Sequence, residues 1–235
     1  MTTYSDRAHI YELLYSYKNY EDEARVIREL LVAEGYSDGR LLDVGCGPAD
    51  HLAYLQGHYD ISGVDLSEQF ITRARERLPD ARFEVADMAD FSLQETFDII
   101  VSLFSAIGYV KTPERLAMTI RCLANHLAPD GIVLIEPWFE PEEWKVGYTD
   151  LMTYKSEDLK IARVTHSSRD RNISIFEARY VMADANGFEE WSEVDELGLF
   201  THEEQIKLLE ENGFSARFEP LEGLADRGLI IAKKR

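Results

Sequence analysis

Two short segments, LLDVGCGPADHL at 41–52 and GVDLS at 63–67, restrict the fold of this chain more than any other feature. Each starts as an apolar run and ends in an acid, Asp43 in the first and Asp65 in the second. The first run is followed by Gly45-Cys46-Gly47, and glycines allow the tight turn that joins a strand to a helix. The two segments therefore predict a β-α-β unit whose parallel strands end at one edge of a sheet.

The alternation of strands and helices continues along most of the chain. Helical periodicity, with caps such as Ser67 and Thr201, predicts helices at 7–17, 20–35, 49–57, 68–78, 113–127 and 201–212. Short apolar runs predict strands at 40–45, 60–65, 82–86, 97–103, 131–136, 214–219 and 227–233. Repeated β-α units favour a parallel sheet with helices on both faces, and a ligand then binds beyond the carboxyl ends of the strands.

The pattern changes at Pro137. Residues 148–198 alternate between apolar and polar side chains, as in Asn172-Ile173-Ser174-Ile175-Phe176, which is typical of half-buried strands. We expect three or four antiparallel strands there, inserted after the fifth parallel strand. The chain is accordingly interpreted as a single domain over residues 1–235, with an antiparallel insertion over 137–198.

Composition narrows the choice of partner and location. A net charge of −19, from 44 acidic and 25 basic residues, disfavours nucleic acid as a partner, because such a surface repels phosphates. Cys46 and Cys122 are the two cysteines and lack metal-ligand spacing, so we expect no metal and a reduced, cytoplasmic location. We also expect no membrane partner, because the N-terminal segment lacks a signal-peptide core and the longest apolar-rich stretch, 99–110, is too short to span a bilayer.

The glycine turn and its neighbouring acids are candidates for a cofactor site. Asp65, at the tip of the second strand, is expected to hold the two hydroxyls of a ribose. The turn is not the dinucleotide fingerprint G-x-G-x-x-G, because Asp50 stands where the third glycine would be. Instead, the segment 43–47 resembles D/E-x-G-x-G, the first motif of class I S-adenosylmethionine (SAM) methyltransferases. At the end of the third strand, Asp87 is expected to accept a hydrogen bond from the adenine amino group, and Met88 to pack on the ring.

A further set of segments extends from the N-terminus to residue 229. They are Tyr4-Ser5, Ile10-Tyr11-Glu12-Leu13, Lys18-Asn19-Tyr20, Asp87-Met88-Ala89-Asp90-Phe91, Phe104-Ser105-Ala106-Ile107-Gly108-Tyr109, Glu136-Pro137-Trp138-Phe139, Thr165-His166-Ser167-Ser168-Arg169, Leu199-Phe200-Thr201 and Arg227-Gly228-Leu229. Together they resemble the N,N-dimethyltransferases that act on dTDP-3-amino-3,6-dideoxyhexoses, in pathways to desosamine, mycaminose and related sugars. The resemblance implies an α/β fold, with a Rossmann-like seven-stranded mixed sheet, helices on both faces and an antiparallel insertion that covers the substrate site.

The motifs and the resemblance together give a set of expected site residues. Those expected to bind SAM are Tyr11, Tyr20, Asp43, Gly45, Gly47, Asp65, Asp87, Met88 and Leu103. Those expected on the nucleotide-sugar side are Trp138, Tyr148, Arg169 and Arg227. Tyr4 and Tyr109 are the expected catalytic residues, as hydroxyls that orient the acceptor nitrogen. The pair Phe139-Glu140 departs from the bulkier apolar pair of the family, which bears on the identity of the sugar more than on the chemistry.

Methyl transfer from a sulfonium is an in-line displacement, for which an enzyme mainly supplies proximity and alignment. We therefore expect a SAM-dependent N-methyltransferase that adds one or two methyl groups to a dTDP-linked 3-amino-3,6-dideoxyhexose, as a monomer or homodimer. The alternatives are a methyltransferase of another small-molecule amine, hydroxyl or carboxylate, and a SAM-binding domain without catalysis. A nucleic-acid methyltransferase is disfavoured, because there is no basic stripe and Ser102-Leu103-Phe104-Ser105 stands where an Asn-Pro-Pro-Tyr type motif would follow the fourth strand.

Overall fold

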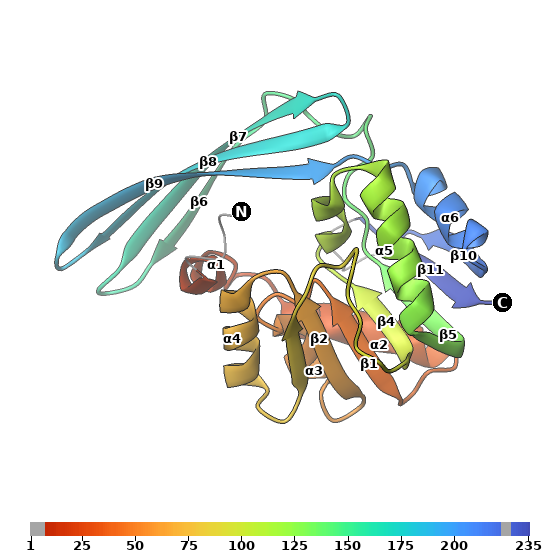
Figure 1. The fold of residues 1–235 in the computed structure, drawn as a ribbon. Helices are drawn as coiled ribbons and strands as arrows, with labels where there is room; N and C mark the ends of the chain where they lie inside the picture. Colours follow the sequence, from red (N-terminus) through yellow and green to blue (C-terminus); the bar gives the residue numbers. More distant parts are fainter. Residues whose placement is uncertain (1–7, 222–226) are drawn as a thin grey trace.

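The computed structural model describes residues 8–221 and 227–235, which form a seven-stranded sheet, a four-stranded sheet and the helices around them (Figure 1). The strands of the larger sheet are β1 (Arg40–Val44), β2 (Asp60–Asp65), β3 (Arg82–Val85), β4 (Phe97–Ser102), β5 (Leu127–Ile135), β10 (Phe214–Glu219) and β11 (Leu229–Lys234). The helices are α1 (Ala8–Leu14), α2 (Tyr20–Ala33), α3 (Asp50–Leu55), α4 (Glu68–Arg77), η2 (Ala106–Val110), α5 (Pro113–His126) and α6 (His202–Glu211). None of the helices in these residues is long and apolar enough to cross a bilayer.

The larger sheet has the order β10-β11-β5-β4-β1-β2-β3, and all neighbouring strands are parallel except those that pair with β11. This confirms the predicted seven-stranded mixed sheet. Because β2 pairs on one side of β1 and β4 on the other, the direction of winding reverses beside β1. A ligand in such a sheet binds where the winding reverses, at the carboxyl ends of the strands.

Alternate residues of the central strands pack on opposite faces of the sheet, as strand geometry requires. Leu41 and Ile99 belong to a buried cluster with side chains from α2, α3 and α4. Their neighbours Leu42 and Ile100 belong to a second cluster with side chains from α5 and α6. Both faces of the sheet are therefore covered, which explains why its strands read as nearly continuous apolar runs.

Side-chain caps fix the starts of α4, α5 and α6. Ser67 Oγ accepts a hydrogen bond from the Phe70 amide at 3.2 Å, at the start of α4. Thr112 caps α5 in the same way, and Thr201 forms a reciprocal capping box with Glu204 at the start of α6. The predicted starts of these helices are confirmed to within about a residue, as expected for caps that satisfy otherwise unpaired backbone donors.

The start of the fifth strand differs from the prediction. A strand was expected at 131–136, but β5 already begins at Leu127, directly after α5. The added residues of β5 include an irregularity of the strand. Asp130 has a φ of 59°, and the pairing of β5 with β4 shifts its register between Phe97 and Ile99.

The second sheet is antiparallel and consists of β6 (Thr149–Lys155), β7 (Lys160–Asp170), β8 (Ile173–Asp184) and β9 (Gly187–Gly198), in that order. Figure 1 shows it extending away from the larger sheet, with α1 between the two. Ile10 and Leu14 of α1 pack in one buried cluster with Ile161, Ala178 and Tyr180 of the second sheet. The N-terminal helix is thereby attached to the insertion by an apolar core of its own.

Candidate active site

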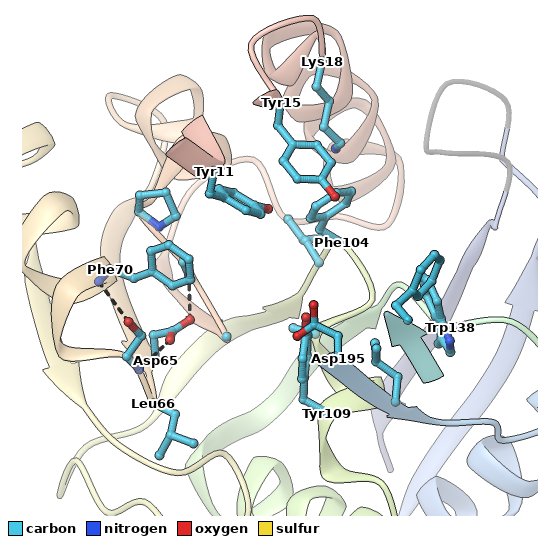
Figure 2. Close-up of a pocket in the computed structure, with 18 of the residues that line it drawn as sticks. Tyr11, Tyr15, Lys18, Asp65, Leu66, Phe70, Phe104, Tyr109, Trp138 and Asp195 are labelled. Atoms are coloured by element: carbon cyan, nitrogen blue, oxygen red, sulfur yellow. Dashed lines mark hydrogen bonds between the residues drawn. The ribbon is translucent and has the colours of Figure 1, made fainter. Parts of the chain in front are cut away.

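A cavity of about 660 Å³ lies between the carboxyl edge of the larger sheet and the second sheet. Its volume lies in the range of small-molecule sites. Several of the expected site residues line it, and they are Tyr11, Gly45, Gly47, Asp65, Asp87, Met88, Leu103, Tyr109, Trp138, Tyr148 and Arg227. In Figure 2, Asp65 and Phe70 lie on one side of this cavity and Trp138 lies on the other.

The glycine turn follows β1 and has the backbone conformation that favours glycine. Gly45 and Gly47 have φ angles of 84° and 54°. A Cβ atom at Gly45 would lie 2.6 Å from the Cβ of Ala106, whereas a Cβ at Gly47 would meet no atom within 4 Å. The backbone amides of Gly45 and Cys46 both donate to the carbonyl of Val64, which ties the turn to β2. Gly45 is therefore required by both space and conformation, while Gly47 leaves room for a ligand.

Asp65 ends β2 and is held by two backbone hydrogen bonds. The amide of Gly47 donates to Oδ2 and the amide of Ser67 donates to Oδ1, each at 2.8 Å. Burial raises the pKa of this carboxyl, and the two amides oppose that rise by stabilising the carboxylate. A carboxylate oxygen accepts more than one hydrogen bond, so both oxygens keep lone pairs for a diol. Fixed in this way, Asp65 has the position and chemistry expected for a ribose-binding acid.

Asp43, in β1, is buried at 2% exposure and does not line the cavity. Its Oδ1 atom has no hydrogen-bond partner among the residues that the structure describes. Burial, together with the charge of Asp65, raises its pKa to about 8. A buried acid with a raised pKa near the glycine turn fits a cationic ligand, because the positive charge would lower the free-energy cost of ionising the acid.

The raised pKa of Asp43 has a testable effect on stability. The unfolded chain releases this proton near pH 4, whereas the folded protein keeps it up to about pH 8. The folded state thus binds the additional proton between these values, and its stability falls as pH rises through that window. In the ligand-free protein, the free energy of unfolding of Asp43→Asn should fall by about 1–3 kcal/mol less between pH 5 and 8 than that of the wild-type protein. Urea unfolding at several pH values checks it, and parallel stability curves for the two proteins would contradict it.

Asp87 follows β3 and is already engaged by the protein. Arg115 Nη2 lies 2.7 Å from each carboxylate oxygen of Asp87, and the amide of Ala89 donates to Oδ1 at 2.9 Å. Burial acts to raise the pKa of Asp87, but Arg115 and the Ala89 amide outweigh it, and the pKa lies below its usual value. An adenine amino group would therefore share this carboxylate with Arg115, a partner that the sequence did not indicate.

The two expected aromatic contacts from the N-terminal helices differ. Tyr11 lines the cavity, with its ring centre 4.6 Å from that of Tyr15 and 5.5 Å from that of Phe70. Tyr20 does not line it, because its ring packs edge-on against His51 of α3 at 5.0 Å. Tyr20 begins α2 and supports the α2–α3 contact, so a direct contact with SAM has no support in this geometry.

On the other side of the cavity, Trp138 and Arg227 form an aromatic and cationic wall. Trp138 Nε1 donates to Ser174 Oγ at 2.9 Å, which joins the segment after β5 to β8. The Arg227 guanidinium lies 5.4 Å from the Trp138 ring centre and forms an ion pair with Glu136 at 3.1 Å. Glu136 is 1% exposed, and its second oxygen accepts from the Phe104 amide at 2.7 Å. Arg227 is thus positioned by a buried carboxylate.

The remaining predicted residues fall in three places. Tyr148 lines the cavity and is half exposed at its mouth. Arg169 does not line it, because its guanidinium donates to Asn172 Oδ1 at 3.1 Å and to the carbonyls of Pro141 and Arg171, so that it stabilises the turn between β7 and β8. Tyr4 lies outside the described residues.

Tyr109, in η2, lies in the interior of the cavity. Burial raises the pKa of its phenol well above the usual value, and the charge of Asp195 adds to the rise. The phenol therefore keeps its proton at neutral pH, and it can orient a ligand by hydrogen bonding without acting as a base.

The structure adds cavity residues that sequence reasoning missed. They include Tyr15, Lys18, Phe70, Arg163, Phe176 and Asp195. Lys18 shortly precedes α2 and Phe70 lies in α4, and the sequence pattern of a helix does not show which of its sides faces a ligand. For Asp195 a signal was present, because the alternation in Glu193-Val194-Asp195 puts two acids on one face of a strand.

Comparison with known proteins agrees with this geometry. The family model described as "Methyltransferase domain" matches residues 41–131. The dTDP-3-amino-3,4,6-trideoxy-alpha-D-glucopyranose N,N-dimethyltransferase of Streptomyces venezuelae is 37% identical over 231 residues, which covers 96% of this chain and 97% of that protein.

Two solved structures are similar over nearly the whole chain. Streptomyces venezuelae DesVI has a TM-score of 0.91 at 34% identity, covering 97% of this chain and 98% of that one. SAM-bound CalS10, an amino pentose methyltransferase from Micromonospora echinaspora, has a TM-score of 0.85 at 33% identity, covering 93% and 92%. The similarity thus includes the second sheet as well as the methyltransferase motifs.

Proposed function

The chain belongs to the family of SAM-dependent N,N-dimethyltransferases of nucleotide-linked amino sugars, and from this premise we propose that it methylates the amino group of a dTDP-linked 3-amino-3,6-dideoxyhexose. The observation that carries the proposal is a single cavity with a fixed acid at a glycine turn on one side and an arginine beside tryptophan on the other. The first half suits an adenosyl sulfonium, and the second suits a nucleotide diphosphate.

The residues of the first half fit SAM. Asp65 offers two fixed acceptors for the ribose hydroxyls, and the open space at Gly47 lets a ligand approach the backbone. Asp43 lies two residues before Gly45, its Oδ1 has no hydrogen-bond partner among the described residues, and a nearby cationic cofactor would favour its charged form. When bound, SAM supplies the methyl group as a sulfonium, a good electrophile that needs no metal or redox partner.

Most of the remaining chemistry is alignment. The acceptor amine must reach the methyl carbon in line with the bond that breaks, and holding both partners in one cavity supplies most of the rate gain. Tyr109, as a neutral phenol, is suited to orient the nitrogen. Arg227, fixed by Glu136, has three further N–H donors beyond the two that Glu136 accepts, and these are suited to the diphosphate.

The proposal is tested by methyl transfer from labelled SAM to a matched set of acceptors. The set comprises a dTDP-3-amino-3,6-dideoxyhexose, the same amino sugar without the nucleotide, and the dTDP-sugar with a hydroxyl in place of the amine. We expect label in the first compound, at least about 100-fold less in the second because a charged anchor is lost, and none in the third. Transfer to an unrelated amine, hydroxyl or carboxylate in preference to the first would instead support a different small-molecule methyltransferase.

The number of methyl groups, the position of the amine, the oligomeric state and the cytoplasmic location stay predictions. A SAM-binding role without catalysis would be revived if SAM bound and no acceptor were methylated.

A further inference from the structure

The inner face of the second sheet carries polar and charged side chains among its apolar ones. In β9, Glu193 and Asp195 are each 4% exposed, whereas Val194 between them is 51% exposed. In β7, Arg163 and Thr165 are buried, whereas Val164 is 53% exposed. The observed register therefore places Arg163, Thr165 and Asp195 on the wall of the cavity.

Asp195 is the buried carboxylate of this face that lines the cavity. Its backbone pairs with Phe176, and both side chains line the cavity. In Figure 2, Asp195 and Tyr109 lie between Asp65 on one side and Trp138 on the other, at the junction of the two halves of the site. Neither the ribose nor the diphosphate accounts for an acid at this position, because Asp65 and Arg227 already serve those groups in the proposed function.

The groups around Asp195 leave it as the candidate for handling a proton. Tyr109 of η2 stays protonated, because burial and the charge of Asp195 both raise its pKa. Arg163 of β7 binds the Tyr15 hydroxyl at 3.2 Å, and it cannot accept a proton. Glu193 of β9 accepts from Trp191 Nε1 at 3.1 Å and does not line this cavity. Asp150 also lines the cavity, but it belongs to β6, which β7 and β8 separate from the strand of Asp195.

We propose that Asp195 is a catalytic residue that binds the protonated acceptor amine and takes its proton before each methyl transfer. The inference rests on the proposed function. The ammonium gives one proton to the Asp195 carboxylate, which leaves a lone pair on nitrogen. The N–C bond then forms as the S–C bond breaks, and the positive charge moves from sulfur to nitrogen. After the carboxylic acid has lost its proton to water and a second SAM has replaced the spent cofactor, the methylammonium gives up one of its two protons in the same way, and a second transfer follows.

Asp195→Asn tests this assignment, because it keeps the shape and removes the base. The value of kcat/KM for a dTDP-3-amino-3,6-dideoxyhexose should fall by at least about 100-fold at neutral pH, as is typical for loss of a general base. The loss should shrink as pH rises, because more of the amine is then already neutral in solution. Calorimetry should give the same SAM affinity as for the wild-type protein.

Glu193→Gln is the matched control, since it changes a carboxylate with the same exposure on the same strand. It should retain activity within a few-fold at every pH. An Asp195→Asn protein within about 3-fold of wild type across the pH range would overturn the assignment. If the wild-type protein methylates no acceptor in the same assay, the proposed function fails instead, so the two failures are distinguishable.

A binding measurement on the wild-type protein covers the case in which Asp195→Asn does not fold. The dTDP-amino sugar should bind at least about 10-fold more tightly at neutral pH than the analogue with a hydroxyl in place of the amine, because the ammonium meets a buried carboxylate. Equal affinities for the two compounds would overturn the proposal.

Discussion

Asp65→Ala should weaken the binding of SAM by about 1.5–3 kcal/mol, or about 10- to 150-fold in Kd. The carboxylate accepts from the amides of Gly47 and Ser67 at 2.8 Å, and the same oxygens are assigned to the ribose hydroxyls. Alanine removes the charged acceptor and also the two bonds that hold the glycine turn against the start of α4. Isothermal calorimetry with SAM measures the change directly.

Asp60→Ala is the control for Asp65→Ala. Asp60 begins the same strand at its opposite end, and its side chain is exposed. It should leave SAM affinity unchanged. If Asp65→Ala bound SAM as tightly as the wild-type protein, the assignment of the ribose to the tip of β2 would be wrong.

Arg227→Ala should lower both stability and affinity for the nucleotide sugar. Without the guanidinium, the carboxylate of Glu136, which is 1% exposed, keeps the Phe104 amide as its one partner among the described residues. Loss of one member of a buried ion pair costs about 3 kcal/mol. For a chain of this size that corresponds to a fall of about 6–12 °C in Tm. The KM for the nucleotide sugar should rise by at least about 10-fold, because charged hydrogen bonds to the diphosphate are lost.

The double variant Glu136→Gln/Arg227→Ala separates the two effects. Glutamine keeps an acceptor for the Phe104 amide without a buried charge, so most of the stability should return. The KM should stay high, because the arginine is still absent. A KM that recovers together with Tm would show that Arg227 acts on the fold alone, and a loss of SAM affinity in either variant would put it on the wrong side of the cavity.

Much of the fold was predictable because its signals are local. The caps at Ser67 and Thr201 act within one turn of their helices, so a short window of sequence contains both the cap and its partner. The same holds for the cofactor half of the site, where Gly45 needs a positive φ and Asp65 ends the following strand. Order and spacing within one β-α-β unit place these residues together without long-range information.

The less predictable features depend on pairs that are distant in the sequence. Arg115 meets Asp87 across 28 positions, and Arg227 meets Glu136 across 91. Nothing in either segment indicates its partner, so Asp87 was interpreted as available for adenine. Arg169 was assigned to the substrate, but the hairpin turn at Asn172 engages its guanidinium. A strand pattern likewise shows which residues share a face and not which face is buried, and for that reason Asp195 was missed.

The most direct test of the account is mass spectrometry of dTDP-3-amino-3,6-dideoxyglucose after incubation with the purified protein and SAM. We expect the compound to gain the mass of one CH₂ unit and then of a second, both located on the amino group by fragmentation. An unchanged mass, in a sample whose SAM binding is demonstrated by calorimetry, would contradict it.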